Sequence, residues 1–208
     1  MAHVALPYIV RAVEKSWTTL WTARIGPLPL ARMHLDAQAT GKIFQELLAY
    51  ALHDEDARWR HPDAPRHARD PDFVFEDPVY NFELKTCGQS GGRAVFGNRC
   101  SSAGIASTSG KSRSTWLLTI NYSLQILNII RFGFVDSTDW IGQRAATGNS
   151  SRLNPETYAS KLRILKGDYQ LRADTRILKG RTPRYATVGE AAEAGCAEAL
   201  AFLQADYY

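Results

Sequence analysis

The chain has 208 residues, of which 45% are hydrophobic and 22% charged, values typical of a globular protein that folds in water. They exclude a fibrous, collagen-like or wholly disordered chain. The best apolar stretch, Leu124–Val135, is interrupted by polar residues and is too short to cross a bilayer. The N-terminus lacks the basic start and apolar core of a secretory signal. We therefore expect one domain over residues 1–208, located in the cytoplasm and away from membranes.

Charge is distributed unevenly along the chain. Residues 89–185 contain 15 lysines and arginines against five acidic residues, whereas the remainder contains 10 against 16. A segment this basic attracts a polyanion such as nucleic acid, although a solvated basic surface has the same composition. We interpret residues 88–185 as the candidate DNA-contacting part of the domain.

The first predicted element in the chain is a helix over Leu35–Leu52, where apolar residues recur at helical spacing. His53–Asp70 shows no periodicity and predicts a loop. Two short runs of strand-forming residues follow, Asp72–Glu76 and Tyr80–Thr86, on either side of the turn pair Asp77-Pro78. This arrangement predicts a β-hairpin.

The second half of the chain predicts more strands and a final helix. Gly88–Lys111 is rich in Gly and Ser and predicts a long surface connection. Trp116–Tyr122 and Ile126–Val135 predict strands, and Pro155–Arg163 is ambiguous. An Ala-rich helix over residues 188–204 closes the chain. The fold class that we expect is α/β, with a mixed central β-sheet flanked by helices and a catalytic core over about residues 36–136.

Charged side chains gather on the predicted hairpin. Because side chains alternate along a strand, Glu83 and Lys85 share one face, while Phe82 and Leu84 point to the other. Pairing across the hairpin brings the carboxylate of Asp72 within reach of Glu83. Two carboxylates suit Mg²⁺, which activates water and neutralises charge that develops on a phosphodiester. The pattern predicts metal ligation by Asp72 and Glu83, with Lys85 orienting or deprotonating the attacking water.

Glu46 is a candidate third carboxylate of this metal site. It lies on the flank of the apolar stripe of the predicted helix, where a solvated helix residue is the alternative. The apolar runs around Asp72 and Glu83 place both acids on segments that become buried, which favours a site. An ordinary ion pair between Glu83 and Lys85 would give the same pattern. In that case the protein would be a non-catalytic DNA-binding module.

Pro71-Asp72 together with Glu83-Leu84-Lys85 resembles the motif of the PD-(D/E)XK nuclease superfamily. Further similarity, at Phe96–Arg99, Phe134–Asp136 and Asp139–Gly148, resembles the ScaI group of type II restriction endonucleases. The resemblance implies a homodimer that cuts both strands of double-stranded DNA at a short palindrome with Mg²⁺. It also implies functional pairing with a cognate DNA methyltransferase. A structure-selective repair or junction nuclease on the same core is the nearest alternative, and a small-molecule enzyme is the least favoured.

Side chains that read bases are also implied by the resemblance. The polar candidates near the similar blocks are Asn98, Arg99, Lys111, Arg113, Gln143 and Arg144. Arginine can bind guanine O6 and N7, and Asn or Gln can bind adenine, although phosphate contact or solvation is the alternative for each of them.

Six other residues in the similar blocks are given structural roles. We expect Asp136 and Asp139 to form a turn or a helix cap. Trp140 and Ile141 are expected to be core or dimer contacts. The Ala145-Ala146 pair is expected to lie in a helix.

Overall fold

The computed structural model describes residues 6–67, 70–88, 95, 114–123, 125–145 and 148–167. Candidate residues Asn98, Arg99, Lys111 and Arg113, and the predicted helix over 188–204, lie outside these ranges. The described elements are α1 (Leu6–Thr22), β1 (Arg24–Ile25), β2 (Leu28–Pro29), η1 (Leu30–Arg32), α2 (Ala37–Glu55), η2 (Pro78–Tyr80), β3 (Phe82–Cys87), β4 (Thr115–Ser123), β5 (Ile126–Val135), η4 (Ser137–Asp139), β6 (Trp140–Ala145), β7 (Gly148–Leu153), α3 (Pro155–Ser160) and β8 (Arg163–Gly167).

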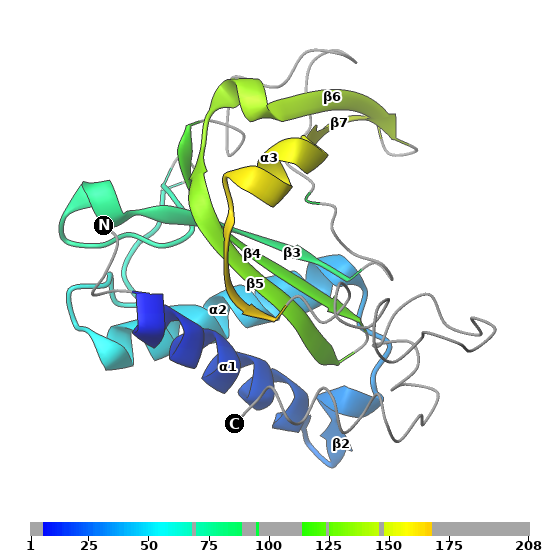
Figure 1. The fold of residues 1–208 in the computed structure, drawn as a ribbon. Helices are drawn as coiled ribbons and strands as arrows, with labels where there is room; N and C mark the ends of the chain where they lie inside the picture. The colour runs from blue at the N-terminus through cyan, green and yellow to red at the C-terminus, as the bar shows by residue number, and fades with distance from the viewer. Residues whose placement is uncertain are drawn as a thin grey trace.

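A four-stranded sheet in the order β3-β4-β5-β8 forms the centre of the fold (Figure 1). β3 pairs with β4 in parallel, whereas β4 with β5 and β5 with β8 are antiparallel. The mixed central sheet expected from the sequence is therefore confirmed. β4 and β5 are both rich in β-branched and aromatic residues, and both were predicted as strands within one or two residues of their bounds.

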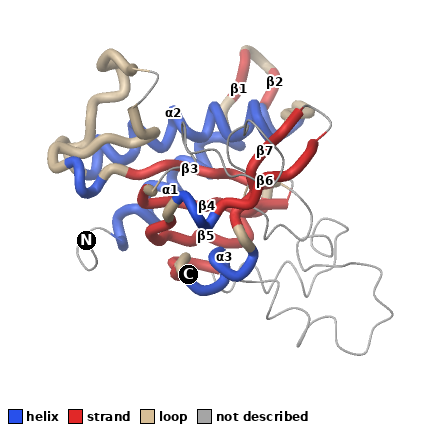
Figure 2. Tube along the Cα trace, turned by 90° about the horizontal axis from the view of Figure 1, so that it is seen from above, coloured by secondary structure: helices blue, strands red, loops and turns tan. Residues whose placement is uncertain are grey.

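Helices α1 and α2 lie side by side and cover one face of this sheet (Figure 1). The core on this side joins Phe44 and Leu48 of α2 to Leu84, Leu118 and Ile130 of the sheet. Figure 2 shows α2 running along β3, the strand with which it makes contact. The fold therefore fixes α2 relative to the strand that carries the predicted site.

The predicted helix over Leu35–Leu52 is confirmed as α2, which begins after the N-cap Asp36. It extends to Glu55, so the prediction of a loop is wrong for residues 53–55. Helix α1 was not predicted, although its buried residues Ile9, Val13 and Leu20 follow helical spacing.

The opposite face of the sheet has a second, smaller core. Leu117 and Val135 of the sheet pack there with Trp140, Leu153 and Leu162. β6 and β7 form an antiparallel ribbon beside α3 (Figure 1), so the expectation of a helix is wrong for Ala145, which ends β6.

Val95 belongs to this second core. It is buried, and its carbonyl oxygen accepts a hydrogen bond from Leu153 N at 2.8 Å. At this residue the predicted surface connection is wrong, because Val95 is buried.

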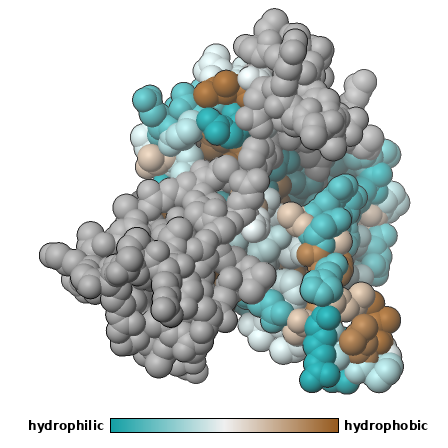
Figure 3. All heavy atoms as spheres, turned by 90° about the vertical axis from the view of Figure 1, so that its right-hand side faces the viewer, coloured by the Kyte–Doolittle hydropathy of each residue, from teal (hydrophilic) through white to brown (hydrophobic). Residues whose placement is uncertain are grey.

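Figure 3 shows a face on which the described apolar areas are small and separated by hydrophilic ones. Exposed apolar side chains of this kind are ordinary on globular proteins. Within the part of the chain that the structure describes, each helix is too short or too polar to cross a membrane.

Candidate active site

Strand β3 presents two charged side chains on the face opposite to α1 and α2. Phe82 and Leu84 point into the core beneath the helices, so the alternation of the strand directs Glu83 and Lys85 to the other face. The side chain of Glu83 is 7% exposed and that of Lys85 14%, and Glu83 Oε2 lies 3.9 Å from Lys85 Nζ. The carboxylate and the ammonium group therefore form a largely buried pair near one edge of the sheet.

Asp72 is attached to this pair through the backbone of β3. Leu84 N, the amide between Glu83 and Lys85 in the chain, donates to Asp72 Oδ2 at 3.0 Å. Gln45 Nε2 of α2 donates to Asp72 Oδ1 at 3.1 Å. The structure thus brings Asp72, Glu83 and Lys85 to one place, with a fixed donor on each oxygen of the Asp72 carboxylate.

The hairpin that was predicted to bring these residues together exists only as one residue pair. Phe73 and Phe82 exchange two backbone hydrogen bonds of 3.1 Å. Toward the turn, Asn81 Oδ1 accepts from Phe75 N at 2.7 Å, and the turn itself is the 3-10 helix η2, capped by Asp77. The hairpin prediction is therefore wrong in extent, and Tyr80 lies in η2 instead of a strand.

Glu46 occupies a different environment from the other predicted acids. Its two carboxylate oxygens accept hydrogen bonds from Arg66 Nη1 and Nη2, each at 2.9 Å. Its side chain is 54% exposed. Among the described residues there is no group of three or more His, Cys, Asp or Glu side chains that could hold a metal ion, so Glu46 is not gathered with Asp72 and Glu83.

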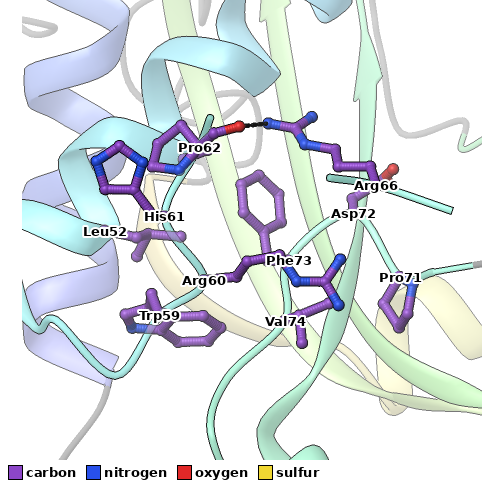
Figure 4. A pocket seen from close by; sticks show the side chains of 11 residues that line it. Leu52, Trp59, Arg60, His61, Pro62, Arg66, Pro71, Asp72, Phe73 and Val74 are labelled. Carbon is purple, nitrogen blue, oxygen red and sulfur yellow. Dashed lines mark hydrogen bonds between the residues drawn. The ribbon is translucent and has the colours of Figure 1, made fainter. Parts of the chain in front are cut away.

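A hollow beside Asp72 is lined mainly by the segment that connects α2 to β3. Figure 4 shows Trp59 and Leu52 at one end of it and Pro71 and Asp72 at the other. Arg66 Nη2 reaches across to the carbonyl oxygen of Pro62 at 3.5 Å (Figure 4). The lining of the hollow is therefore partly apolar and includes the charged residues Arg60, Arg66 and Asp72.

Asp70, next to the Pro71-Asp72 pair, is held by an ion pair. A hydrogen bond from Arg60 is the main cause that lowers the pKa of the Asp70 carboxyl from its ordinary value, followed by the backbone amide of His67. Ion pairing therefore fixes the segment immediately before Asp72.

The polar face continues across the sheet from Lys85. In register, Lys85 lies beside Thr119 of β4, which lies beside Arg131 of β5. Arg131 Nη1 donates to the carbonyl oxygens of Tyr158 at 2.9 Å and Leu162 at 3.0 Å. α3 therefore covers this face of the sheet at β5. β3, which carries Glu83 and Lys85, lies at the end of the strand order, two strands from β5.

Asp136 and Asp139 cap η4, as expected. Asp136 N donates to Asp139 Oδ2 at 2.8 Å and Thr138 N donates to Asp136 Oδ1 at 2.9 Å. Trp140 is 3% exposed and belongs to the core, whereas Ile141 is 43% exposed.

The base-reading candidates Gln143 and Arg144 lie on β6, opposite Ser150 and Asn149 of β7. Their backbone position therefore places them on the ribbon beside α3.

A mixed sheet with helices packed on one face, and with two carboxylates and a lysine brought together at its end strand, has the arrangement expected of a PD-(D/E)XK nuclease core. The profile of the ScaI restriction endonuclease family matches residues 2–166, and the chain belongs to this family. The resemblance found in the sequence is confirmed at this level.

A curated relative is the type II restriction enzyme ScaI of Streptomyces caespitosus, which is 26% identical over 160 residues. The match covers 70% of this chain and 66% of that enzyme, slightly less than two thirds of its length. No solved structure matches the chain.

Sequence reasoning missed Gln45, the residue of α2 that contacts Asp72. Its position beside Glu46, on the flank of the stripe formed by Phe44 and Leu48, was the available signal. The choice between the two neighbours depends on how α2 is rotated against the segment that carries Asp72.

Proposed function

We propose that this protein is a type II restriction endonuclease that hydrolyses phosphodiester bonds of double-stranded DNA at a short palindrome. The observation that supports this most is the hydrogen bond from Leu84 N to Asp72 Oδ2, because it holds a second carboxylate beside Glu83 and Lys85. Membership of the ScaI family supports the same function. The basic composition of residues 88–185 supports a nucleic acid substrate.

Asp72 and Glu83 would hold Mg²⁺ in this proposal. The donor set fits, since Mg²⁺ is commonly bound by one or two carboxylates together with water and substrate phosphate. When bound, Mg²⁺ would lower the pKa of water and neutralise charge on the phosphodiester. Glu46 joins these ligands only if its ion pair with Arg66 opens.

The remaining work of the site is done by groups of the protein itself. Lys85 places a positive charge beside Glu83, where the ammonium group can orient the attacking water and stabilise charge that develops on the phosphate. Burial of Glu83 and Lys85 strengthens these electrostatic effects, because the local dielectric constant is lower than in water. The hydrogen bonds from Leu84 and Gln45 keep Asp72 in a fixed orientation.

DNA recognition is assigned to the basic part of the chain. Gln143 and Arg144 on the β6–β7 ribbon are proposed to contact bases, since a two-stranded ribbon fits the major groove. The candidates outside the described residues, Asn98, Arg99, Lys111 and Arg113, are proposed for the same role. We propose further that the enzyme acts in the cytoplasm as a homodimer on two-fold symmetric sites, together with a methyltransferase that protects host DNA.

The test is to incubate the purified chain with a long duplex DNA of known sequence, with Mg²⁺ or with EDTA, and to sequence the fragment ends. Fragments that require metal and share one palindrome are expected. Cleavage should be lost in Asp72→Asn, Glu83→Gln and Lys85→Met but retained in Asp54→Asn, which changes an exposed carboxylate of α2. Cleavage by Glu46→Gln tests the third candidate ligand. Loss of cleavage is expected if Glu46 binds the metal, and unchanged cleavage would exclude this role.

DNA binding separates the nuclease from a binding module. The Asp72→Asn and Glu83→Gln variants should bind duplex DNA as tightly as the unchanged protein or more tightly, because both carboxylates repel phosphate. Loss of binding together with loss of cutting, in variants that remain folded, would contradict the assignment. A duplex that stays uncut with every divalent metal would also refute it.

A further inference from the structure

We infer that Gln45 is a positioning residue that fixes the Asp72 carboxylate in the orientation needed to bind a divalent cation. The inference rests on the proposed function of Asp72. Gln45 Nε2 donates to Asp72 Oδ1 at 3.1 Å, in a partly buried position. The inference assigns a role to an amide side chain of α2 that does not itself bind the metal.

Two donors on different oxygens define the plane of a carboxylate. Leu84 N holds Oδ2 and Gln45 Nε2 holds Oδ1 of Asp72. An ionised carboxylate offers about four lone-pair sites, so accepting hydrogen bonds from Leu84 and Gln45 is compatible with binding a cation. Asp72 lies outside the regular helices and strands, and these side-chain bonds therefore add orientation that its own backbone does not supply.

The donor amide is attached to a well-packed helix. Gln45 lies between Phe44 and Leu48, both fully buried in the core under the sheet. One turn earlier, a Cβ on Gly41 would lie 2.6 Å from Thr86 Oγ1 of β3, so α2 approaches the strand closely at this point. Gln45 is thereby fixed to the same strand that carries Glu83 and Lys85.

The neighbouring residue of α2 holds the same connecting segment. Glu46 binds Arg66 through two hydrogen bonds, six residues before Asp72. Two consecutive residues of α2 therefore make different contacts with this segment. Glu46 anchors the segment by an exposed ion pair, whereas Gln45 reaches the carboxylate of the site itself.

Gln45→Met tests this role, because it keeps the length of the side chain and removes the donor. The matched control is Gln38→Met, the same substitution at an exposed position of the same helix. Two readouts are taken: the Mg²⁺ concentration that gives half-maximal cleavage, and calorimetric titration of Mn²⁺ into the protein without DNA. Loss of a residue that orients a metal ligand weakens metal binding by about 10-fold to 100-fold.

We expect Gln45→Met to need at least about 10-fold more Mg²⁺, to recover cleavage at saturating Mg²⁺, and to bind Mn²⁺ more weakly. Gln45→Asn, in which the amide is one methylene too short to reach Asp72, should show the same shift and serves if the Met variant does not fold. A lower melting temperature with unchanged metal dependence would refute the inference. If the unchanged protein does not cut DNA, the proposed function fails instead.

Discussion

The carboxylate of Asp139 joins three segments of the second core, and its replacement by alanine should destabilise the fold by about 3 kcal/mol. Asp139 is 7% exposed. Its Oδ1 accepts from Thr157 Oγ1 at 2.9 Å, and its Oδ2 accepts from Asp136 N at 2.8 Å and Lys161 Nζ at 2.7 Å. The substitution therefore removes the acceptor of three donors: the amide of Asp136 before η4, the hydroxyl of Thr157 in α3 and the ammonium group of Lys161 after α3.

The magnitude follows from the donors that lose their acceptor. The hydroxyl of Thr157 is buried and the amide of Asp136 partly buried, and an unsatisfied donor in such a position costs roughly 1–3 kcal/mol. Lys161 contributes little, because its side chain is 43% exposed and keeps Asp136 as a partner at 3.0 Å. Two donors at about 1.5 kcal/mol each give the total of about 3 kcal/mol.

Urea unfolding at neutral pH measures this loss, provided that the slope m stays unchanged between variants. Asp139→Asn keeps an acceptor oxygen for Thr157 and should lose about half as much stability. Because Asp139 belongs to a cap and not to the proposed site, folded Asp139→Ala protein should still cleave DNA. A loss below about 1 kcal/mol, or loss of cleavage in fully folded protein, would refute this reasoning.

Two further predictions concern the neighbourhood of Asp139. Hydrogen bonds from Thr138 and Lys161 lower the pKa of Asp136 to about 2, so its ionised form stabilises the fold above the ordinary carboxyl pKa and loses this effect as the pH falls toward 2. Melting temperatures should therefore be lower for Asp136→Asn than for the unchanged protein at pH 7, and the difference should vanish near pH 2; a constant difference would contradict it. At Gly133 a Cβ would lie 2.2 Å from the carbonyl oxygen of Lys161 and 3.0 Å from Leu162 Cα. Gly133→Ala should destabilise by about 2 kcal/mol or more in urea unfolding, and equal stability would show that the backbone there can shift freely.

Periodicity predicted the elements that bury a continuous apolar face. α2 and the β4–β5 pair have such faces, and their predicted bounds differ from the observed ones by only a few residues. β8 and the β6–β7 ribbon are different, because their strands are short and polar. Arg163–Gly167 forms a strand because it pairs with β5. Pairing of this kind depends on tertiary context and is weakly encoded in the local sequence.

The residues of the candidate site could be predicted from the sequence, but the residue that contacts and orients Asp72 could not. Alternation along β3 is a property of any strand, so the shared face of Glu83 and Lys85 follows from the sequence alone. The contact of Gln45 with Asp72 depends on the rotation of α2 and on the path of the segment after it. Neither is encoded in the local spacing of residues.

The proline before Asp72 gives a physical reason for the shortened hairpin. Phe73 and Phe82 form a hydrogen-bonded pair, so the next such pair of an antiparallel ladder would be Pro71 with Leu84. Pro71 has no N–H and cannot complete that pair, and the amide of Leu84 binds the side chain of Asp72 instead. In a continued ladder the carbonyl oxygen of residue 71 would occupy this amide, and Asp72 would lose the donor that holds it beside Glu83 and Lys85. The same residue that ends the strand pairing thus leaves a backbone donor available to the carboxylate of the site.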